Sequence, residues 1–247
     1  MKSKNIFVFI LVIIIFLGGI YLGRTLFSDK TIEEKIVYKE SSVKDLRRNE
    51  IGIPAVNENN NGVIATLVTE VKPGNGLVLV NINDILADFY TQFSARTAAS
   101  VASNYTGVNL SNIDVVYQIK ANASIVGGPS AGAAMTIATI ALLSNNQLKE
   151  DVMITGAINE NGNIERVGAV PQKAEAAKAI GIKLFLIPVG DNFLATEYER
   201  EKSCNTYNGK EFCQVVYKAK EIRAFSDSDL EIKEVKNIDE AVKLFLK

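Results

Sequence analysis

The sequence predicts an α+β fold that is preceded by one transmembrane helix. Short runs rich in β-branched residues alternate with helical patterns from residue 62 to the end of the chain. The first 27 residues contain a long apolar run that is typical of a membrane span. Apolar residues make up 47% of the 247 residues, which is enough for a packed core and too many for a disordered chain.

Residues 1–27 are predicted to form an N-terminal membrane anchor. Ile6 to Gly23 runs for 18 residues without a charge, and Ile6 to Phe27 supplies the roughly 20 residues that a helix needs to cross the hydrocarbon core. The alternatives are a buried core helix and a cleaved signal peptide, whose apolar region is usually only about 7–15 residues long. No clear small-x-small cleavage site follows Gly23, so we expect a single-pass anchor that stays on the protein.

Residues 28–61 are predicted to be a juxtamembrane segment and a linker. The charged run from Thr31 to Arg48 predicts a helix, and Asn57 to Gly62 reads as a turn. Residues 62–247 are predicted to be one domain, with a polar insertion at about 190–228.

Within this domain, apolar residues at helical spacing predict helices and β-rich runs predict strands. The helix that begins at Asp84 is expected to be capped by that residue, and the helix that begins at Pro171 is expected to end at Gly181. The expected helices are Asp84–Ser103, Ser130–Leu143, Pro171–Ile180 and Ile238–Leu246. The β-rich runs predict strands over Val63–Val71, Leu77–Ile82, Asp114–Lys120, Val152–Ile158, Ile164–Val167, Lys183–Ile187 and Leu230–Val235. The turn signal from Pro73 to Gly76 predicts that the first two strands form a hairpin.

Charge and composition exclude several classes of function. Lys plus Arg number 27 and Asp plus Glu number 28, and this net charge of −1 argues against a nucleic-acid binder that relies on a basic face. The chain has no histidine, which excludes Ser-His-Asp and Cys-His catalysis and histidine metal sites. Two cysteines are too few for a four-thiolate zinc site. We therefore expect no metal and no other cofactor.

The segment from Gly127 to Gly132 is the densest chemical signal in the chain. Its glycines leave room for another backbone to approach, and Ser130 stands at the start of a predicted helix. Free N–H groups and the helix dipole favour negative charge there, which suits an oxyanion beside a serine nucleophile. The alternative is that Ser130 is only a helix cap and the glycines only a turn.

A nucleophilic serine needs a base, and without histidine a neutral lysine can serve. Lys173 is the candidate because it lies in the first turn of a predicted helix, where the dipole opposes an ammonium charge. Alanines around it allow close packing, and desolvation also lowers the pKa of a lysine. Lys178 lies about 140° further around the helix and faces elsewhere. The alternative is that Lys173 is an ordinary exposed helix lysine.

Three linked motifs together resemble the proteolytic domain of Lon proteases. They are GGPSAGAAM, TGAINENGNIERVGAV and PQKAEAAKAIGIKLFLIP. In that family a serine in a PSAG segment and a lysine in a K-x-x-A-A-x-x-x-G helix form the catalytic dyad. The resemblance assigns these roles to Ser130 and Lys173, which are 43 residues apart as the family spacing requires. Thr155 matches the family's threonine near the dyad lysine.

The resemblance covers roughly residues 62–190 and resumes at 230–246. It implies a Lon-like fold, with a mixed sheet and packed helices. Lon proteases usually carry an ATPase module before this domain, but the 247 residues contain no G-x-x-x-x-G-K-[ST] loop. Two further positions depart from the family: Gly127 replaces a common acidic residue before Gly-Pro-Ser, and Gln118 stands near the place of a common histidine. In outline the chain is similar to membrane-anchored, ATPase-free Lon-like proteases, including archaeal ones.

The resemblance therefore implies an ATP-independent serine endopeptidase on a membrane. Lys173 takes the proton of Ser130, which attacks the peptide carbonyl, and Thr155 holds the lysine amine. Backbone groups of the serine turn, around Gly128 and Ala131, are expected to hold the oxyanion.

The expected partners are polypeptide substrates, either unfolded or exposed as loops. The stretch from Val116 to Ile125 is predicted to pair with an extended substrate and contains the polar residues Gln118, Lys120 and Asn122. Whether copies of the chain form a homo-oligomer is left open by the sequence.

Two other classes of function remain as alternatives. The Lon proteolytic domain shares a superfold with small-molecule kinases, in which a Gly-Ser-rich helix start cradles phosphate. The other alternative is an inactive protease fold that serves as a membrane-tethered interaction module. Proteolysis assays separate this module from the peptidase.

The two cysteines bear on the side of the membrane, because the lysines and arginines flanking the anchor do not decide its orientation. Cys204 and Cys213 bracket a polar segment with a turn signal at Asn208 and Gly209. A disulfide between them would persist only in an oxidising compartment, and two unrelated thiols are the alternative. We expect the bond, and with it a catalytic domain outside the cytoplasm.

Overall fold

The computed structural model describes residues 16–17, 43–83, 86–121, 125–190, 194–207, 210–223 and 229–247. The chain divides into two units, Met1–Ile36 and Val37–Lys247, and every strand and helix named below belongs to the second. Apart from Phe16 and Leu17, the anchor expected over Ile6 to Phe27 lies outside the described residues. Among the residues that are described, no helix is long and apolar enough to cross a membrane.

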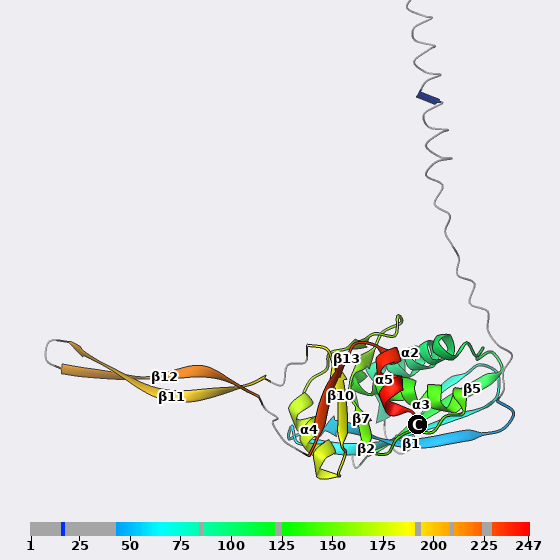
Figure 1. Ribbon diagram of the computed structural model, residues 1–247, viewed down its shortest axis with the longest axis horizontal. Coiled ribbons are helices and arrows are strands. Elements are labelled where there is room, and N and C mark those ends of the chain that lie inside the picture. Colours follow the sequence, from blue (N-terminus) through cyan, green and yellow to red (C-terminus); the bar gives the residue numbers. More distant parts are fainter. Residues whose placement is uncertain are drawn as a thin grey trace, which may run out of the picture. The chain divides into compact units, whose positions relative to one another are not determined.

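A four-stranded mixed sheet forms one layer of the domain (Figure 1). Its order is β1-β2-β5-β3, in which β1 and β2 are antiparallel, β2 and β5 are antiparallel, and β3 is parallel to β5. The strands are β1 (Arg47–Val56), β2 (Gly62–Pro73), β3 (Val78–Asn81) and β5 (Ile113–Lys120). The order shows that the predicted hairpin of Val63–Val71 with Leu77–Ile82 is wrong. β5 lies between these two segments, and β2 instead pairs with β1.

The segment from Pro73 to Gly76 carries the chain past the end of β5 rather than closing a hairpin. The carboxylate of Asp114 accepts hydrogen bonds from the backbone N–H groups of Asn75 (2.8 Å) and Leu77 (2.9 Å). These bonds satisfy two backbone N–H groups where the chain leaves β2. The chain therefore reaches β3 on the far side of β5.

β1 lies partly in the segment that was expected to be a juxtamembrane helix. Arg48 and Glu50 are exposed along it while Ile53 and Pro54 are buried, so its charges line one edge of the sheet. An edge strand with an exposed face tolerates such charges, which is why this segment does not read as a strand from its composition. Residues 31–42 of the expected helix lie outside the described residues.

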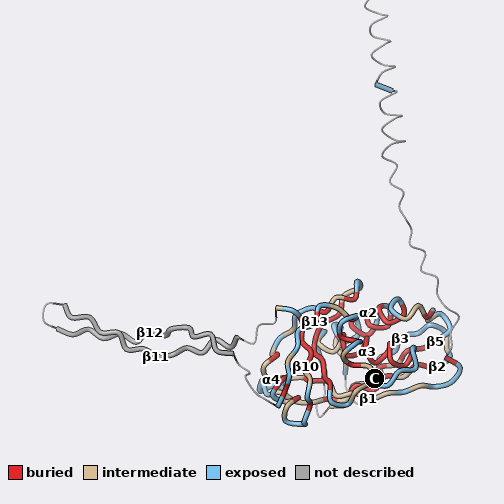
Figure 2. Tube along the Cα trace, viewed as in Figure 1, coloured by how far each residue is buried: buried red, intermediate tan, exposed pale blue. Residues whose placement is uncertain are grey.

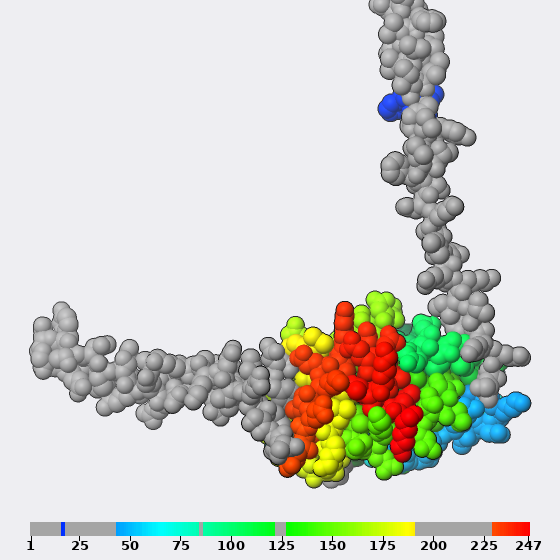
Figure 3. Space-filling view, viewed as in Figure 1, coloured from blue at the N-terminus to red at the C-terminus, as the bar shows by residue number. Residues whose placement is uncertain are grey.

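A second sheet is parallel and has the order β13-β10-β7. Its strands are β7 (Val152–Ile154), β10 (Leu184–Pro188) and β13 (Glu231–Val235), and a short antiparallel pair, β8 (Ala157–Ile158) and β9 (Ile164–Glu165), follows β7. The expected strand Val152–Ile158 is thus interrupted at Thr155 and Gly156. In Figure 3 the C-terminal residues, orange to red, lie beside the yellow residues of β10, although about 40 residues separate them in the chain.

The helices pack on these sheets, and the most buried of them is α3 (Gly132–Ser144). Every residue of α3 from Gly132 to Leu143 is buried, and Figure 2 shows buried residues clustered around this helix. A helix that is apolar on all sides belongs in a core. The others are α2 (Phe89–Thr106), α4 (Val170–Ala179) and α5 (Ile238–Phe245). The cap of α2 is Asp88, four residues later than the expected cap Asp84, which lies outside the described residues.

The expected insertion at 190–228 contains two long antiparallel strands, β11 (Leu194–Tyr207) and β12 (Lys210–Arg223). Cys204 and Cys213 are directly opposite each other in this register. Directly opposed residues of antiparallel strands have Cα atoms about 4.5–5.5 Å apart, which lies within the range that a disulfide spans. The turn residues Asn208 and Gly209 lie outside the described residues.

Candidate functional site

The serine of the GGPSAG motif lies in a helical turn at the start of α3. The 3₁₀ turn η1 (Pro129–Ala131) contains Ser130, which is partly exposed, and continues into α3 at Gly132. Gly128 precedes the turn with φ 94° and ψ 159°, a conformation that favours glycine. At Gly132 a Cβ would lie 2.9 Å from Ile158 Cγ2, so only glycine lets the helix start approach β8 this closely.

The serine turn is fixed to the β7–β8 connection by two backbone hydrogen bonds. Gly156 N–H donates to the carbonyl of Ser130 and Ala133 N–H donates to the carbonyl of Gly156, both at 3.0 Å. Gly156 directly follows Thr155. Thr155, in the interruption between β7 and β8, is therefore the neighbour of the residue whose backbone bonds to the serine turn.

The lysine of the third motif is buried and meets Thr155. Lys173, in α4, has 3% of its surface exposed and Thr155 has none, and Lys173 Nζ donates a hydrogen bond to Thr155 Oγ1 at 3.3 Å. α4 begins at Val170, and Lys173 N–H donates to the carbonyl of Ala169, so the lysine stands in the first turn of the helix. Burial and the positive end of the helix dipole both disfavour an ammonium ion there.

Ser130 and Lys173 border the same cavity, which has a volume of about 840 Å³. Its walls come from the serine turn, the start of α4 with the preceding residues, and the connected ends of β1 and β2. Most of the lining is apolar or backbone, and its charged residues are Arg166 and Lys173. The two residues that the sequence singles out are therefore brought to one hollow, although 43 residues separate them.

The other expected site residues are placed differently. Ala131 and Gly128 line the cavity, but the N–H of Gly128 donates to the Asp88 carboxylate at 3.0 Å, so it is not free to hold an oxyanion. From β5 and its end, Ile119 and Ala121 line the cavity.

Because side chains alternate along a strand, Gln118 and Lys120 belong to the opposite face of β5 from Ile119, and Lys120 pairs there with Glu50 at 3.6 Å. The strand is paired with β2 on one side and with β3 on the other from Val116 to Gln118, so this stretch has no edge for a substrate strand. Asn122 lies outside the described residues.

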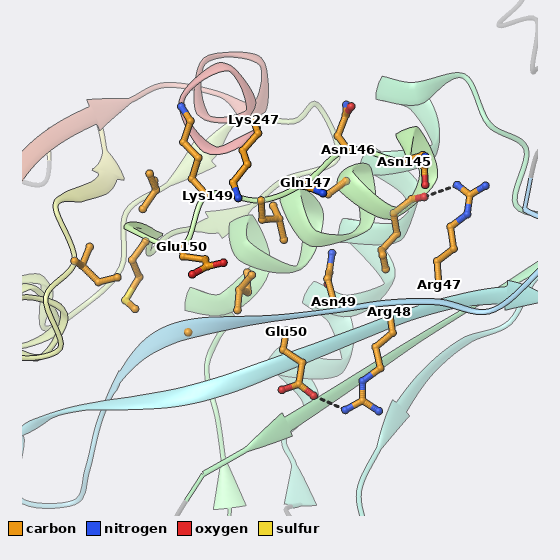
Figure 4. A pocket seen from close by; sticks show the side chains of 18 of the residues that line it. Arg47, Arg48, Asn49, Glu50, Asn145, Asn146, Gln147, Lys149, Glu150 and Lys247 are labelled. Atoms are coloured by element: carbon orange, nitrogen blue, oxygen red, sulfur yellow. Dashed lines mark hydrogen bonds and ion pairs between the residues drawn. The ribbon is translucent and has the colours of Figure 1, made fainter.

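A second cavity of about 830 Å³ lies between β1 and the end of α3 and has no part in this site (Figure 4). Several of its polar side chains are engaged with each other or with backbone, while Asn49 Oδ1 is buried without a hydrogen-bond partner. Arg47 donates to the carbonyl of Leu142 at 2.8 Å, Arg48 pairs with Glu50, and Lys149 donates to the carbonyl of Leu244 at 2.9 Å.

Asp88 is a residue of the site that the sequence reasoning missed. Its carboxylate caps α2 by accepting from Thr91 N–H at 2.7 Å, and it also contacts the serine turn through Gly128. Asp84 and Asp88 are both acceptable caps by residue type, and the helical pattern after them does not choose between them. The group that Asp88 caps is the backbone N–H of Thr91, which any residue except proline would supply, so residue types alone do not indicate the later cap.

Comparison with known proteins gives one family match and a set of relatives. The model of the Lon protease (S16) C-terminal proteolytic domain matches residues 59–196. An archaeal Lon protease of Archaeoglobus fulgidus is 28% identical over 179 residues, which are 70% of this chain and 28% of that protein. An archaeal Lon protease of Methanocaldococcus jannaschii is 32% identical over 131 residues, 51% of this chain and 20% of that protein. The chain thus matches less than a third of the length of these relatives.

Proposed function

Because the chain belongs to the Lon protease (S16) C-terminal proteolytic domain family, we propose that it is a serine peptidase with Ser130 as nucleophile and Lys173 as general base. One observation carries this proposal: Ser130 and a buried lysine amine border the same cavity. A buried amine has few structural uses, and a neutral lysine beside a serine is a known way to activate a hydroxyl.

Each group then has a chemical task. Burial keeps the Lys173 amine neutral, and Thr155 Oγ1, which accepts its hydrogen bond, orients it. The amine takes the proton of Ser130 as the hydroxyl oxygen attacks the peptide carbonyl. The resulting ammonium then protonates the leaving amine, and the acyl group stays on Ser130. Water hydrolyses this ester with Lys173 again as base, which regenerates the free serine.

The oxyanion of the tetrahedral intermediate needs hydrogen-bond donors close to Ser130. The N–H of Gly128 is occupied by Asp88, so we assign this task to the N–H of Ser130 at the start of the helical turn. The start of α3 adds the positive end of a helix dipole.

The substrates in this proposal are unfolded polypeptides or exposed loops. The cavity lining is mostly apolar, which suits the side chains that unfolding exposes. The proposed chemistry uses Ser130, Lys173 and water, so hydrolysis of an unfolded peptide by these 247 residues needs no ATP. The apolar run from Ile6 to Phe27 supports an anchor in a membrane, and Cys204 opposite Cys213 supports a domain on its oxidising side.

Covalent labelling tests the dyad most directly. A fluorophosphonate probe should label the full-length wild type on Ser130, and Ser130→Ala should remove the label. Lys173→Met, which keeps the bulk of the side chain without an amine, should slow labelling by at least 100-fold. Lys178→Ala, on the same helix, is the matched control and should label at the wild-type rate. Labelling of Lys173→Met at the wild-type rate would overturn the assignment of the base.

The second test concerns energy supply. Hydrolysis of an unstructured fluorogenic peptide by the purified chain should be the same with and without ATP and magnesium. Stimulation of the pure chain by ATP would contradict the proposal of ATP independence, without affecting the dyad.

A further inference from the structure

The start of α2 holds both backbone groups of Gly128, two residues before the proposed nucleophile. Gly128 N–H donates to Asp88 Oδ2 at 3.0 Å, and the Gly128 carbonyl accepts from Thr91 Oγ1 at 3.4 Å. Thr91 is 1% exposed, so this contact is made inside the protein. Glycine at φ 94° has wide conformational freedom when it is not held, so these two bonds determine how the chain enters the serine turn.

The residues before each partner also pair. β4 (Leu86–Ala87) and β6 (Ile125–Val126) form a short parallel pair that ends directly before Asp88 and Gly127. The serine turn is therefore fixed on its entry side by α2 and on its exit side by the bonds between Ser130, Ala133 and Gly156. Asp88 is the side chain that connects the entry side to a helix.

The carboxylate of Asp88 is held in its charged form. Burial raises its pKa, but hydrogen bonds from Thr91 and Gly128 outweigh burial and leave the pKa below its usual value. A hydrogen bond to a charged acceptor is stronger than one between neutral groups. Asp88 also packs closely against Gly127, because a Cβ at Gly127 would lie only 2.8 Å from Asp88 Oδ2.

We propose that Asp88 is a positioning residue of the peptidase, which sets the serine turn for attack by Ser130 without touching the substrate. This inference rests on the proposed function. It assigns to one carboxylate two tasks that can be separated: capping α2 through Thr91 N–H and holding Gly128 N–H.

Substitutions at Asp88 separate the two tasks. In Asp88→Asn the side-chain oxygen still caps α2, but the amide group presents N–H donors to the Gly128 N–H. Asp88→Ser keeps a capping oxygen that is too short to reach Gly128. For both variants we expect kcat for an unstructured peptide to fall about tenfold or more, with KM within twofold, because a small misplacement of a nucleophile slows chemistry more than binding. Fluorophosphonate labelling of Ser130 should slow by the same factor.

The matched control is Asn237→Ala at the start of α5. Asn237 caps that helix by accepting from Glu240 N–H at 3.0 Å and has no contact with the serine turn. Asn237→Ala should lower the midpoint of urea unfolding, as the loss of a helix cap does, and leave kcat unchanged. Wild-type kcat in both Asp88 variants, or a loss that appears in KM alone, would overturn the inference while the wild type still labels on Ser130. A wild type that neither labels nor cleaves would instead refute the proposed function, on which this inference rests.

Discussion

Replacing Gly62 by alanine tests how closely the helix that carries Lys173 is held against the sheet. Gly62 is the first residue of β2, and a Cβ there would lie 1.9 Å from the carbonyl oxygen of Gln172. Real Cβ atoms essentially never come closer than 3.0 Å to another atom, so the Gln172 backbone has to move by more than 1 Å. Gln172 immediately precedes Lys173, and the displacement is therefore passed to the lysine.

The structure sets the size of both effects. Overpacking of this kind costs about 1–3 kcal/mol in the free energy of unfolding, because backbone cannot swing aside as a side chain can. A shift of about 1 Å in a catalytic group can lower the rate by roughly 100-fold. We expect Gly62→Ala to reduce kcat/KM for an unstructured peptide by 10- to 100-fold, although Gly62 does not contact the proposed nucleophile.

Peptide hydrolysis and urea unfolding of the same preparations measure the two effects together. Gly52→Ala is the control on the neighbouring strand, since its Cβ would come too close only to a side-chain end, Met153 Cε at 2.8 Å, and would meet Ile64 Cγ2 at an ordinary contact distance of 3.5 Å. That methyl can rotate away, so Gly52→Ala should retain nearly full activity. Equal activity of Gly62→Ala and the wild type would refute the placement of α4 against β2.

Three further predictions concern stability and redox state. Tyr117→Phe should lower the free energy of unfolding by about 1 kcal/mol, measured with urea. The buried Tyr117 hydroxyl donates to Thr139 Oγ1 at 2.6 Å, because the hydroxyl of Thr139 itself donates to a backbone carbonyl. A loss above about 3 kcal/mol would contradict this arrangement. Hydrogen bonds from the backbone of Leu77 and Asn75 lower the pKa of Asp114 in the folded protein. The stabilisation from this carboxylate is therefore present above its unfolded pKa of about 3.9 and is lost as pH falls through the lower folded pKa. Asp114→Asn should make the free energy of unfolding less dependent on pH in this acid range, and an unchanged dependence would refute the prediction. Cys204 and Cys213 should be bonded in protein from unreduced cells, and two free thiols on denaturation without reductant would refute the bond and the argument for an exterior domain.

The parts of the fold that depend on local patterns could be predicted from the sequence. The helices expected over Ser130–Leu143 and Pro171–Ile180 correspond to α3 and α4, with bounds that differ by one or two residues. They could be predicted because the apolar spacing, and the proline and glycine at the ends, lie within the segments themselves. Serine and lysine stood out because their residue types and spacing matched a known pattern. That both border one cavity required the structure.

The partners of the strands could not be predicted, because each strand pairs with segments that are distant in the sequence. A turn signal between two β-rich runs normally implies a hairpin, but at Pro73 to Gly76 the side chain of Asp114 stabilises a different route. β1 was missed for a related reason, since charges on Arg48 and Glu50 suit an edge strand as well as a surface helix. Whether Asp84 or Asp88 caps α2 depends on the serine turn, which only the folded chain brings near.

The burial of α3 from Gly132 to Leu143 couples the position of the proposed nucleophile to the stability of the whole domain. The helix that starts beside Ser130 cannot slide or tilt without opening voids among the residues around it, and close-packed interiors resist such voids. Loss of activity on heating should therefore coincide with global unfolding instead of preceding it.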